Sequence, residues 1–220
     1  MEILHRQTLQ LDDKEIVSRI LEGEKELYEI LLRRYNQTLF RAIRSYINEQ
    51  VDVEDAMQNT YLRAYEKLNQ YRGESAFHTW LIRIGINEAL KHLRSRKKRQ
   101  NLFSVNDEDH TSNIIQLSDQ KMMNPEMKVI QGETRRLIEK AIDQLPEKYR
   151  TVYMLREVEG IPNSEIADCL DISESNVKVR LHRAKTLLKE TLYNLSLTTE
   201  VFEFGNTHCD LLVARVMQLI

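Results

Sequence analysis

Apolar residues recur at helical spacing along most of this 220-residue chain, and few residues interrupt the pattern. The six glycines and three prolines are too few for the frequent turns that separate short strands. Met57, Tyr61, Ala64 and Leu68, for example, are spaced so that they form one buried face of a helix over about 52–70. We find no alternating strand pattern of useful length. The sequence therefore predicts an all-α fold.

The helical pattern is interrupted over residues 100–128, where the acidic and polar run NDEDHTSN is followed by Pro125. A structureless stretch of this length is uncommon inside one compact domain. We therefore predict two small helical domains, 12–99 and 129–195, joined by a flexible linker, with a C-terminal extension at 196–220. The helices expected are 12–34, 35–48, 52–70 and 76–99 in the first domain, and 126–144, 147–158, 162–170 and 174–194 in the second.

The charge is segregated although the formal net charge is only −2. Residues 83–99 contain seven Lys or Arg and one acid, Glu88. Residues 175–189 contain five Lys or Arg and no acid. Two short basic surfaces on a mildly acidic body indicate two contacts with one polyanion.

Cysteine content and hydropathy limit the class of protein. The two cysteines, Cys169 and Cys209, cannot make a disulfide framework, which favours a reducing cytoplasm. No window approaches about 18 consecutive apolar residues, and the start lacks a basic segment followed by an apolar one. We expect a cytoplasmic protein with neither a membrane span nor a secretory signal.

The sequence lacks the common catalytic signatures HExxH, GxSxG, GxGxxG and the P-loop. A nuclease would need clustered carboxylates, and the only candidate is the run Asp107–Asp109 in the linker. The adjacent His208 and Cys209 have no second ligand pair at metal-binding spacing. We therefore expect no enzymatic activity, no cofactor and no metal.

Residues 161–187 have the spacing of a helix-turn-helix. Ala167 supplies the small residue where the two helices cross, and Ser173 is a good N-cap for the second helix. Asp171 stands at the turn, where glycine is usual, but Asp tolerates left-handed backbone better than most residues. This segment therefore predicts a DNA-binding hairpin.

The second helix of this hairpin offers polar and basic residues on its outward face. Lys and Arg pair with guanine edges or phosphates in the major groove, and Asn pairs with adenine. The alternative is an ordinary αα-hairpin with a solvated basic face. The candidate DNA-binding residues are Ser175, Asn176, Lys178, Val179, His182 and Arg183.

A glycine-containing loop, YRGES at residues 71–75, precedes an aromatic pair and the first basic helix. Stacking platforms and a positive track are what hold single-stranded nucleic acid. The alternative makes Phe77 and Trp80 core residues, and for Trp80 we favour that alternative. For the basic face we favour nucleic-acid binding, because its like charges would repel one another without a polyanion.

A third segment, DVEDAMQNTYL, places Asp55, Gln58, Asn59 and Leu62 opposite the apolar stripe of the same helix. A polar face that ends in an exposed leucine is a candidate protein-docking surface. By itself the pattern is more typical of a solvated helix face, and we favour that interpretation when the segment is taken alone.

Together the three segments resemble one protein family. The chain contains DVEDAMQNTYLRAYEKLNQYRGESAFHTWLIRIGINEALKHLRSRKKR and, after the polar linker, LPEKYRTVYMLREVEGIPNSEIADCLDISESNVKVRLHRAKTLLK. This order is similar to that of bacterial RNA polymerase sigma factors of the sigma-70 family, in the compact extracytoplasmic-function class. The resemblance covers about residues 12–194, and two unrelated motifs occur at the expected separation.

The resemblance implies a promoter-specificity subunit without catalytic activity. In the first domain, region two, the face of Asp55, Gln58, Asn59 and Leu62 would dock on the clamp coiled coil of the largest polymerase subunit. The residues implied to capture the unpaired minus-ten strand are Arg72, Gly73, Glu74, Ser75 and Ala76 of the loop, and Arg83, Asn87 and Lys91 of the next helix.

In the second domain, region four, the resemblance implies that Lys178, His182 and Arg183 read the minus-thirty-five element in the major groove. The implied partners are core RNA polymerase, through its clamp and the flap of the second-largest subunit, promoter DNA and an anti-sigma factor. Asn59 departs from the Glu usual in the family, and Pro162–Asn163 replaces the common Ser-Tyr.

The main alternative is a stand-alone helix-turn-helix transcription regulator, whose N-terminal helices would bind a ligand or dimerise. That alternative predicts duplex binding by the isolated protein with no need for polymerase. The basic helix after YRGES argues against it, because a simple repressor does not require one. The extension at 196–220 carries Leu212, Val216 and Leu219 on one helical face, which suits packing on region four or binding of a regulator.

Overall fold

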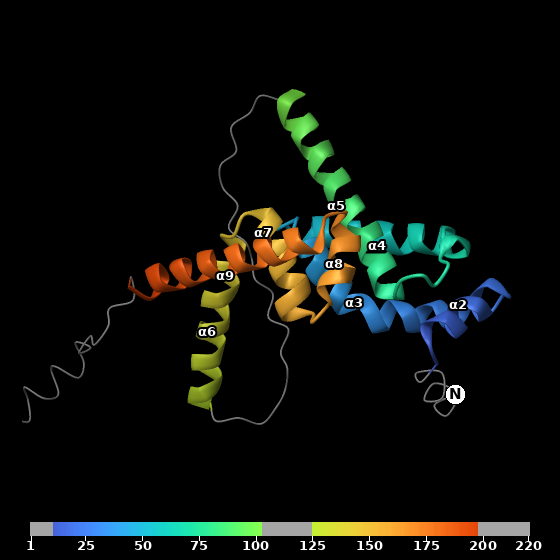
Figure 1. Ribbon diagram of the computed structural model, residues 1–220, viewed down its shortest axis with the longest axis horizontal. Helices are drawn as coiled ribbons and strands as arrows, with labels where there is room; N and C mark the ends of the chain where they lie inside the picture. The colour runs from blue at the N-terminus through green and yellow to red at the C-terminus, as the bar shows by residue number, and fades with distance from the viewer. Residues whose placement is uncertain (1–10, 103–124, 198–220) are drawn as a thin grey trace, which may run out of the picture. The chain divides into compact units, whose positions relative to one another are not determined.

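The computed structural model describes residues 11–102 and 125–197, and every regular element in these ranges is helical (Figure 1). The predicted all-α class is therefore confirmed. None of the described helices is both long and apolar enough to cross a bilayer. The elements are α2 (Asp13–Leu21), η1 (Lys25–Leu27), α3 (Tyr28–Arg44), α4 (Gln50–Glu66), η2 (Leu68–Gln70), α5 (Phe77–Leu102), α6 (Pro125–Asp143), α7 (Glu147–Tyr153), the π-helical turn η3 (Met154–Val158), α8 (Asn163–Leu170) and α9 (Glu174–Leu197).

The expected boundary between helices at 12–34 and 35–48 is wrong. Gly23 has φ +119°, a conformation that ends α2 and that residues with a Cβ rarely adopt. Next to this break the Arg19 side chain donates from Nε to Glu24 at 2.9 Å. The next helix, α3, then runs without interruption through Tyr35, where we expected a boundary. The remaining helices lie close to the predicted positions.

Contacts divide the described residues into two compact units. The larger unit contains α2–α5, α7, α8 and α9 as far as Lys185. The smaller unit contains α6 and the rest of α9 from Thr186.

The first core of the larger unit lies among α2, α3, α4 and α5, and the last three of these helices contact one another in pairs (Figure 1). Leu39 and Ile43 of α3, Val53 of α4 and Leu81 of α5 are each at most 1% exposed. Burying each such side chain contributes about 1.5–3 kcal/mol. Gly85 allows α5 to approach α3, because a Cβ there would lie 2.6 Å from Leu39 Cδ1. This bundle holds the candidate surfaces on α4 and α5 in fixed positions.

A second buried cluster joins the helix-turn-helix to this bundle. Val152, Leu155 and Ile166 of α7, η3 and α8 share the cluster with Ile82 and Ile86 of α5. The hairpin therefore has its own core and is also packed on α5 within the larger unit.

Candidate nucleic-acid and protein interfaces

The turn between α8 and α9 has the geometry that the sequence predicts. Asp171 ends α8 with φ 54° and ψ 49°, in the left-handed region, and the Ile172 N–H donates to the Ala167 carbonyl at 3.1 Å. Ser173 caps α9, since its Oγ accepts a hydrogen bond from the Asn176 N–H at 3.2 Å. These contacts fix the direction in which α9 leaves the turn.

The predicted DNA-binding residues of α9 all lie on its exposed side. Val177 and Ala184 on the opposite side are fully buried, whereas Val179 is 65% exposed. The Asn176 Oδ1 accepts a hydrogen bond from Arg180 Nε at 2.9 Å. An exposed valine surrounded by polar and basic groups suits contact with a thymine methyl group. The exposed set is Ser175, Asn176, Lys178, Val179, His182 and Arg183.

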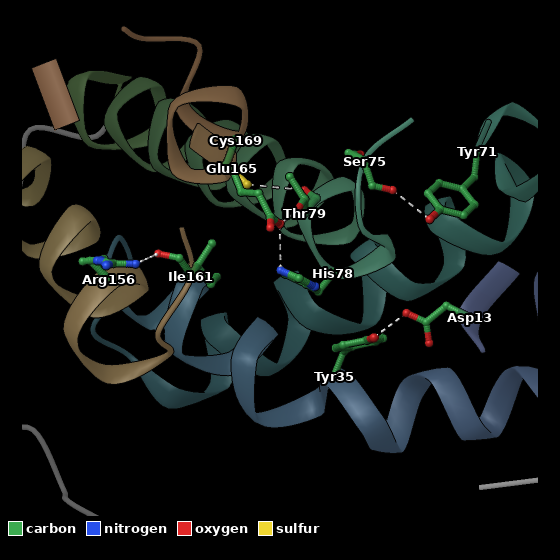
Figure 2. A network of polar contacts seen from close by, with 10 residues as sticks. All are labelled: Asp13, Tyr35, Tyr71, Ser75, His78, Thr79, Arg156, Ile161, Glu165 and Cys169. Carbon is green, nitrogen blue, oxygen red and sulfur yellow. Dashed lines mark hydrogen bonds and ion pairs between the residues drawn. The ribbon is translucent and has the colours of Figure 1, made fainter. Parts of the chain in front are cut away.

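The loop before α5 is held by contacts at its two ends. The Tyr71 hydroxyl donates to the Ser75 carbonyl at 2.9 Å (Figure 2). Gly73 has φ +69°, and a Cβ there would lie 2.9 Å from Cε of Lys14. The candidate loop residues Arg72, Glu74 and Ala76 are exposed, and Gly73 and Ser75 are half-buried. The loop is thus a closed turn that presents short segments to solvent.

The aromatic residues near this loop pack together rather than standing free. The Tyr71 ring centroid lies 5.4 Å from that of Phe77 and 5.5 Å from that of Trp80. Phe77 is 1% exposed, and Trp80 is half-buried against the first core. This packing agrees with the core interpretation that we favoured for Trp80.

Arg83, Asn87 and Lys91 are exposed and follow one another at four-residue spacing along α5. Glu88 does not neutralise this row, because it is 6% exposed and its carboxylate is 2.8 Å from Arg63 Nη1. The side of α5 that bears Arg83 is thus positive and accessible.

The candidate docking residues Asp55, Gln58, Asn59 and Leu62 are all exposed on α4. Gln58 and Leu62 line a groove of ≈ 860 Å³ between α3 and α4, whereas Asp55 and Asn59 are not among its lining residues. Leu62 is 58% exposed at the edge of this groove. The structure therefore brings half of the predicted set to one concave surface.

Sequence reasoning missed the aromatic lining of this α3–α4 groove. Tyr28 and Phe40 of α3 and Tyr65 of α4 line it, and the Tyr28 and Tyr65 centroids are 5.1 Å apart. Tyr61, which we expected in the core, is half-buried and donates from its hydroxyl to Asn36 Oδ1 at 3.0 Å. The available signal was the four-residue spacing of Tyr28, Leu32, Asn36 and Phe40, a second face of α3.

Desolvation shapes the chemistry of the groove. Burial raises the pKa of Tyr61 to about 12. Burial also raises the pKa of Tyr28, whose hydroxyl donates to the Tyr61 carbonyl at 2.8 Å. The phenols therefore remain neutral, and the groove is an apolar, hydrogen-bonding surface rather than an ionic one.

The smaller unit has a second apolar groove, of ≈ 420 Å³, between α6 and the end of α9. Its exposed residues include Leu137 at 41%, Ile138 at 40% and Tyr193 at 64%. The other lining residues are Thr134, Leu192 and Leu195.

Within residues 11–102 and 125–197, no group of three or more His, Cys, Asp or Glu side chains could hold a metal ion. The acidic run Asp107–Asp109, the pair His208–Cys209 and the apolar face of the C-terminal extension lie outside these ranges.

Comparison with known families identifies both halves of the chain. The family described as Sigma-70 region 2 matches residues 31–99, and the family described as Sigma-70, region 4 matches residues 135–188. The ECF RNA polymerase sigma-E factor of Haemophilus influenzae is 30% identical over 186 residues, which cover 84% of this chain and 98% of that protein. The RNA polymerase sigma-H factor of Pseudomonas aeruginosa is 31% identical over 186 residues, 84% of this chain and 96% of that protein.

Solved structures share the fold. CnrH in complex with the cytosolic domain of CnrY gives a TM-score of 0.58 at 21% identity, covering 83% of this chain and 97% of that one. The sigma factor RpoE in complex with the anti-sigma factor NepR from Bartonella quintana gives a TM-score of 0.61 at 21% identity, covering 76% and 96%.

Proposed function

We propose that this chain divides promoter recognition among its helices. The chain belongs to the sigma-70 family and is a sigma factor of the extracytoplasmic-function class. As a sigma factor it directs promoter-specific initiation and is not an enzyme. We place region two at residues 12–99 and region four at 129–195. The observation that carries the assignment is that two separate basic faces and an apolar groove are exposed on the described helices.

Region four reads the minus-thirty-five element through the exposed side of α9. Lys178 and Arg183 supply charged donors for guanine edges or phosphates, and Asn176 supplies an amide. The Ser173 cap and the left-handed turn at Asp171 support this role, because they fix the angle at which the helix enters the major groove.

Region two captures the melted minus-ten strand through the loop Arg72–Ala76 and the row Arg83, Asn87 and Lys91. The support is the positive, accessible side of α5 next to a closed turn that presents backbone and short side chains. Single strands are held by such positive tracks.

Core polymerase docks on α4, where Gln58 and Leu62 border the α3–α4 groove. A groove with aromatic walls and a few polar groups fits the apolar side of a partner helix, as the clamp coiled coil would offer. Asp55 and Asn59 contact the polar side of the same partner. The flap of the second-largest subunit docks in the α6–α9 groove, which is apolar and belongs to region four.

An anti-sigma factor regulates the chain by covering one or both grooves. The support is that both apolar surfaces are exposed in the described part of the chain, and that one related fold was solved with an anti-sigma factor bound. Because its partners are polymerase and promoter DNA, we place the protein in the cytoplasm.

The test is co-purification with bacterial core RNA polymerase, followed by run-off transcription on a promoter library. We expect stoichiometric binding and initiation from a restricted set of promoters, and we expect Leu62→Asp to lose both. Glu15→Ala, an exposed change on α2, is the matched control. Tight duplex binding by the free protein without any affinity for core would instead identify a stand-alone helix-turn-helix regulator.

A further inference from the structure

The α6–α9 groove of the smaller unit is lined mainly by aliphatic side chains. Leu137 and Ile138 of α6 are 41% and 40% exposed, and Tyr193 of α9 is 64% exposed. Leu192 and Leu195 of α9 line the same groove and are half-buried. Apolar residues gathered on one exposed surface mark a site where another surface binds. With a volume of ≈ 420 Å³, the groove has room for a few aliphatic side chains from such a surface.

The segment that follows α9 in the sequence offers a matching apolar face. The helix α9 ends at Leu197, and we call residues 198–220 the tail. Leu212, Val216 and Leu219 of the tail recur at the spacing of one helical face. The last ten residues, LLVARVMQLI, contain a single charged side chain, Arg215. An aliphatic face of this kind gains free energy when it leaves water for an apolar surface.

The tail begins close to the groove. Leu192, which lines the groove, lies five residues before Leu197, or about 7.5 Å along the axis of α9. The 15 residues from Leu197 to Leu212 can span up to about 50 Å when extended. The aliphatic face of the tail therefore reaches the groove without strain. A short tether of this kind gives an effective concentration in the millimolar range.

The chemistry of the two grooves favours the α6–α9 groove as the site of the tail. The α3–α4 groove is lined by Lys25, Glu54 and several amide side chains, which an aliphatic face would strip of water without offering hydrogen bonds. In the α6–α9 groove the polar lining side chains are Thr134 and Tyr193. A second copy of the chain would compete only at its own concentration in solution, far below that of a tethered segment.

We propose that the tail binds in the α6–α9 groove through Leu212, Val216 and Leu219, and so acts as a tethered competitor of any partner that docks there. The competition rests on the function assigned above, in which the polymerase flap uses this groove. In the free protein the tail covers the groove, and the flap binds only when it displaces the tail. The apparent affinity for core polymerase is therefore lowered in proportion to the fraction of molecules in which the groove is open.

A photo-crosslink in the full-length chain tests the contact. A benzophenone amino acid replaces Tyr193, an aromatic side chain exposed in the groove, and the irradiated protein is digested and mapped by mass spectrometry. We expect crosslinks to peptides of the tail, with a yield that does not change on dilution. The same probe in place of Tyr65, which lines the α3–α4 groove, is the control and should not mark the tail.

Charges on the aliphatic face should release the tail. Leu212→Asp with Val216→Asp places two carboxylates against an apolar groove, and we expect the crosslink from position 193 to fall at least about tenfold. Gln218→Asp adds a carboxylate off that face and is the matched control, which should keep the crosslink. We expect the double variant, but not Gln218→Asp, to bind core polymerase half-maximally at a concentration at least about threefold lower than wild type. All three positions follow α9, so the helices that form the groove are retained.

The outcomes separate the tail from the function. If the probe at position 193 gives no tail crosslink, or the probe at position 65 gives an equal one, the proposal is overturned whatever the protein does with polymerase. Crosslinks between isotopically light and heavy copies would overturn it in favour of a second copy. If the crosslink forms and is lost in the double variant but core affinity does not change, the competition is overturned. A wild type that binds no core polymerase refutes the proposed function, and the crosslink alone still decides where the tail binds.

Discussion

The Cys169 thiol donates to the Thr79 carbonyl over 3.5 Å and so joins the first helix of the helix-turn-helix to α5. Burial, followed by the negative charges of Glu165 and Asp168, raises the pKa of this thiol to about 12. At neutral pH the sulfur is therefore a buried, protonated donor, and the thiolate that would react with alkylating reagents is scarce.

Reactivity of Cys169 should therefore report whether α8 stays packed on α5. In a Cys209→Ser background we expect slow labelling by a maleimide in the folded protein and faster labelling in Glu165→Ala, which loses the hydrogen bond to Thr79 and a negative charge that raises the pKa of the thiol. Equal rates in the two proteins, measured by mass spectrometry, would contradict protection of this thiol by the contact of α8 with α5.

Lys178→Ala and Arg183→Ala should weaken promoter use without affecting core binding. Each loses a charged donor on the exposed side of α9, worth about 1–3 kcal/mol per base contact. Run-off transcription and duplex affinity at fixed salt measure the loss. Lys189→Ala, an exposed change further along the same helix, is the control. Unchanged transcription in both variants would refute the assignment of α9 as the recognition helix.

The helix-turn-helix was predictable because its signals are local. Ser173 and Asp171 act on their own neighbours, so their types alone indicated the cap and the left-handed turn that the structure contains. The break at Gly23 was missed because apolar periodicity continues on both sides of it. The positive φ that marks the break is a property of the folded backbone, and the presence of a glycine in the sequence does not reveal it.

The packing of the hairpin on α3 and α5 and the α3–α4 groove were not predictable for a different reason. Ala42, Ser45 and Thr151 are small or polar residues whose types do not indicate an interface, and they become buried only because distant helices meet. We expected Tyr61 in the core because helical periodicity alone does not distinguish a filled core from an open groove. Such pairings depend on contacts between segments that are distant in the sequence, and local patterns do not specify them.

The double change Asp55→Ala with Gln58→Ala tests the docking face of α4. Both side chains are exposed and neither supports the core, so helical content by circular dichroism should be retained. We expect core polymerase to bind at least several-fold more weakly, as for loss of central interface contacts worth about 1–2 kcal/mol. Duplex binding by region four should be unaffected. Co-purification at wild-type levels would exclude this face.

Replacing glycine by alanine should have opposite effects on stability at two positions, because α5 lies close to α3 at Gly85 whereas Gly132 has open space beside it. In Gly85→Ala the new Cβ would lie 2.6 Å from Leu39 Cδ1, and Leu39 is fully buried. Overpacking of about 1–3 kcal/mol should exceed the helical gain of about 0.5–1 kcal/mol. Gly132→Ala in α6 meets nothing within 4 Å and should stabilise its helix. Urea unfolding that ranks both variants above wild type would contradict this packing.

Alkaline pH should weaken the fold through the groove tyrosines. Burial raises the pKa of Tyr61 to about 12 from an ordinary value near 10, and the pKa of Tyr28 is raised as well. As pH rises past 10 the unfolded phenols lose protons first, so stability present below that pH is lost toward the folded pKa. Tyr61→Phe should be slightly less stable at neutral pH, because the bond to Asn36 is lost, but its stability should fall less steeply above pH 10. Urea midpoints of the variant and of wild type across this range measure how steeply stability falls with pH. Parallel slopes would show that burial in the groove does not raise the pKa of Tyr61.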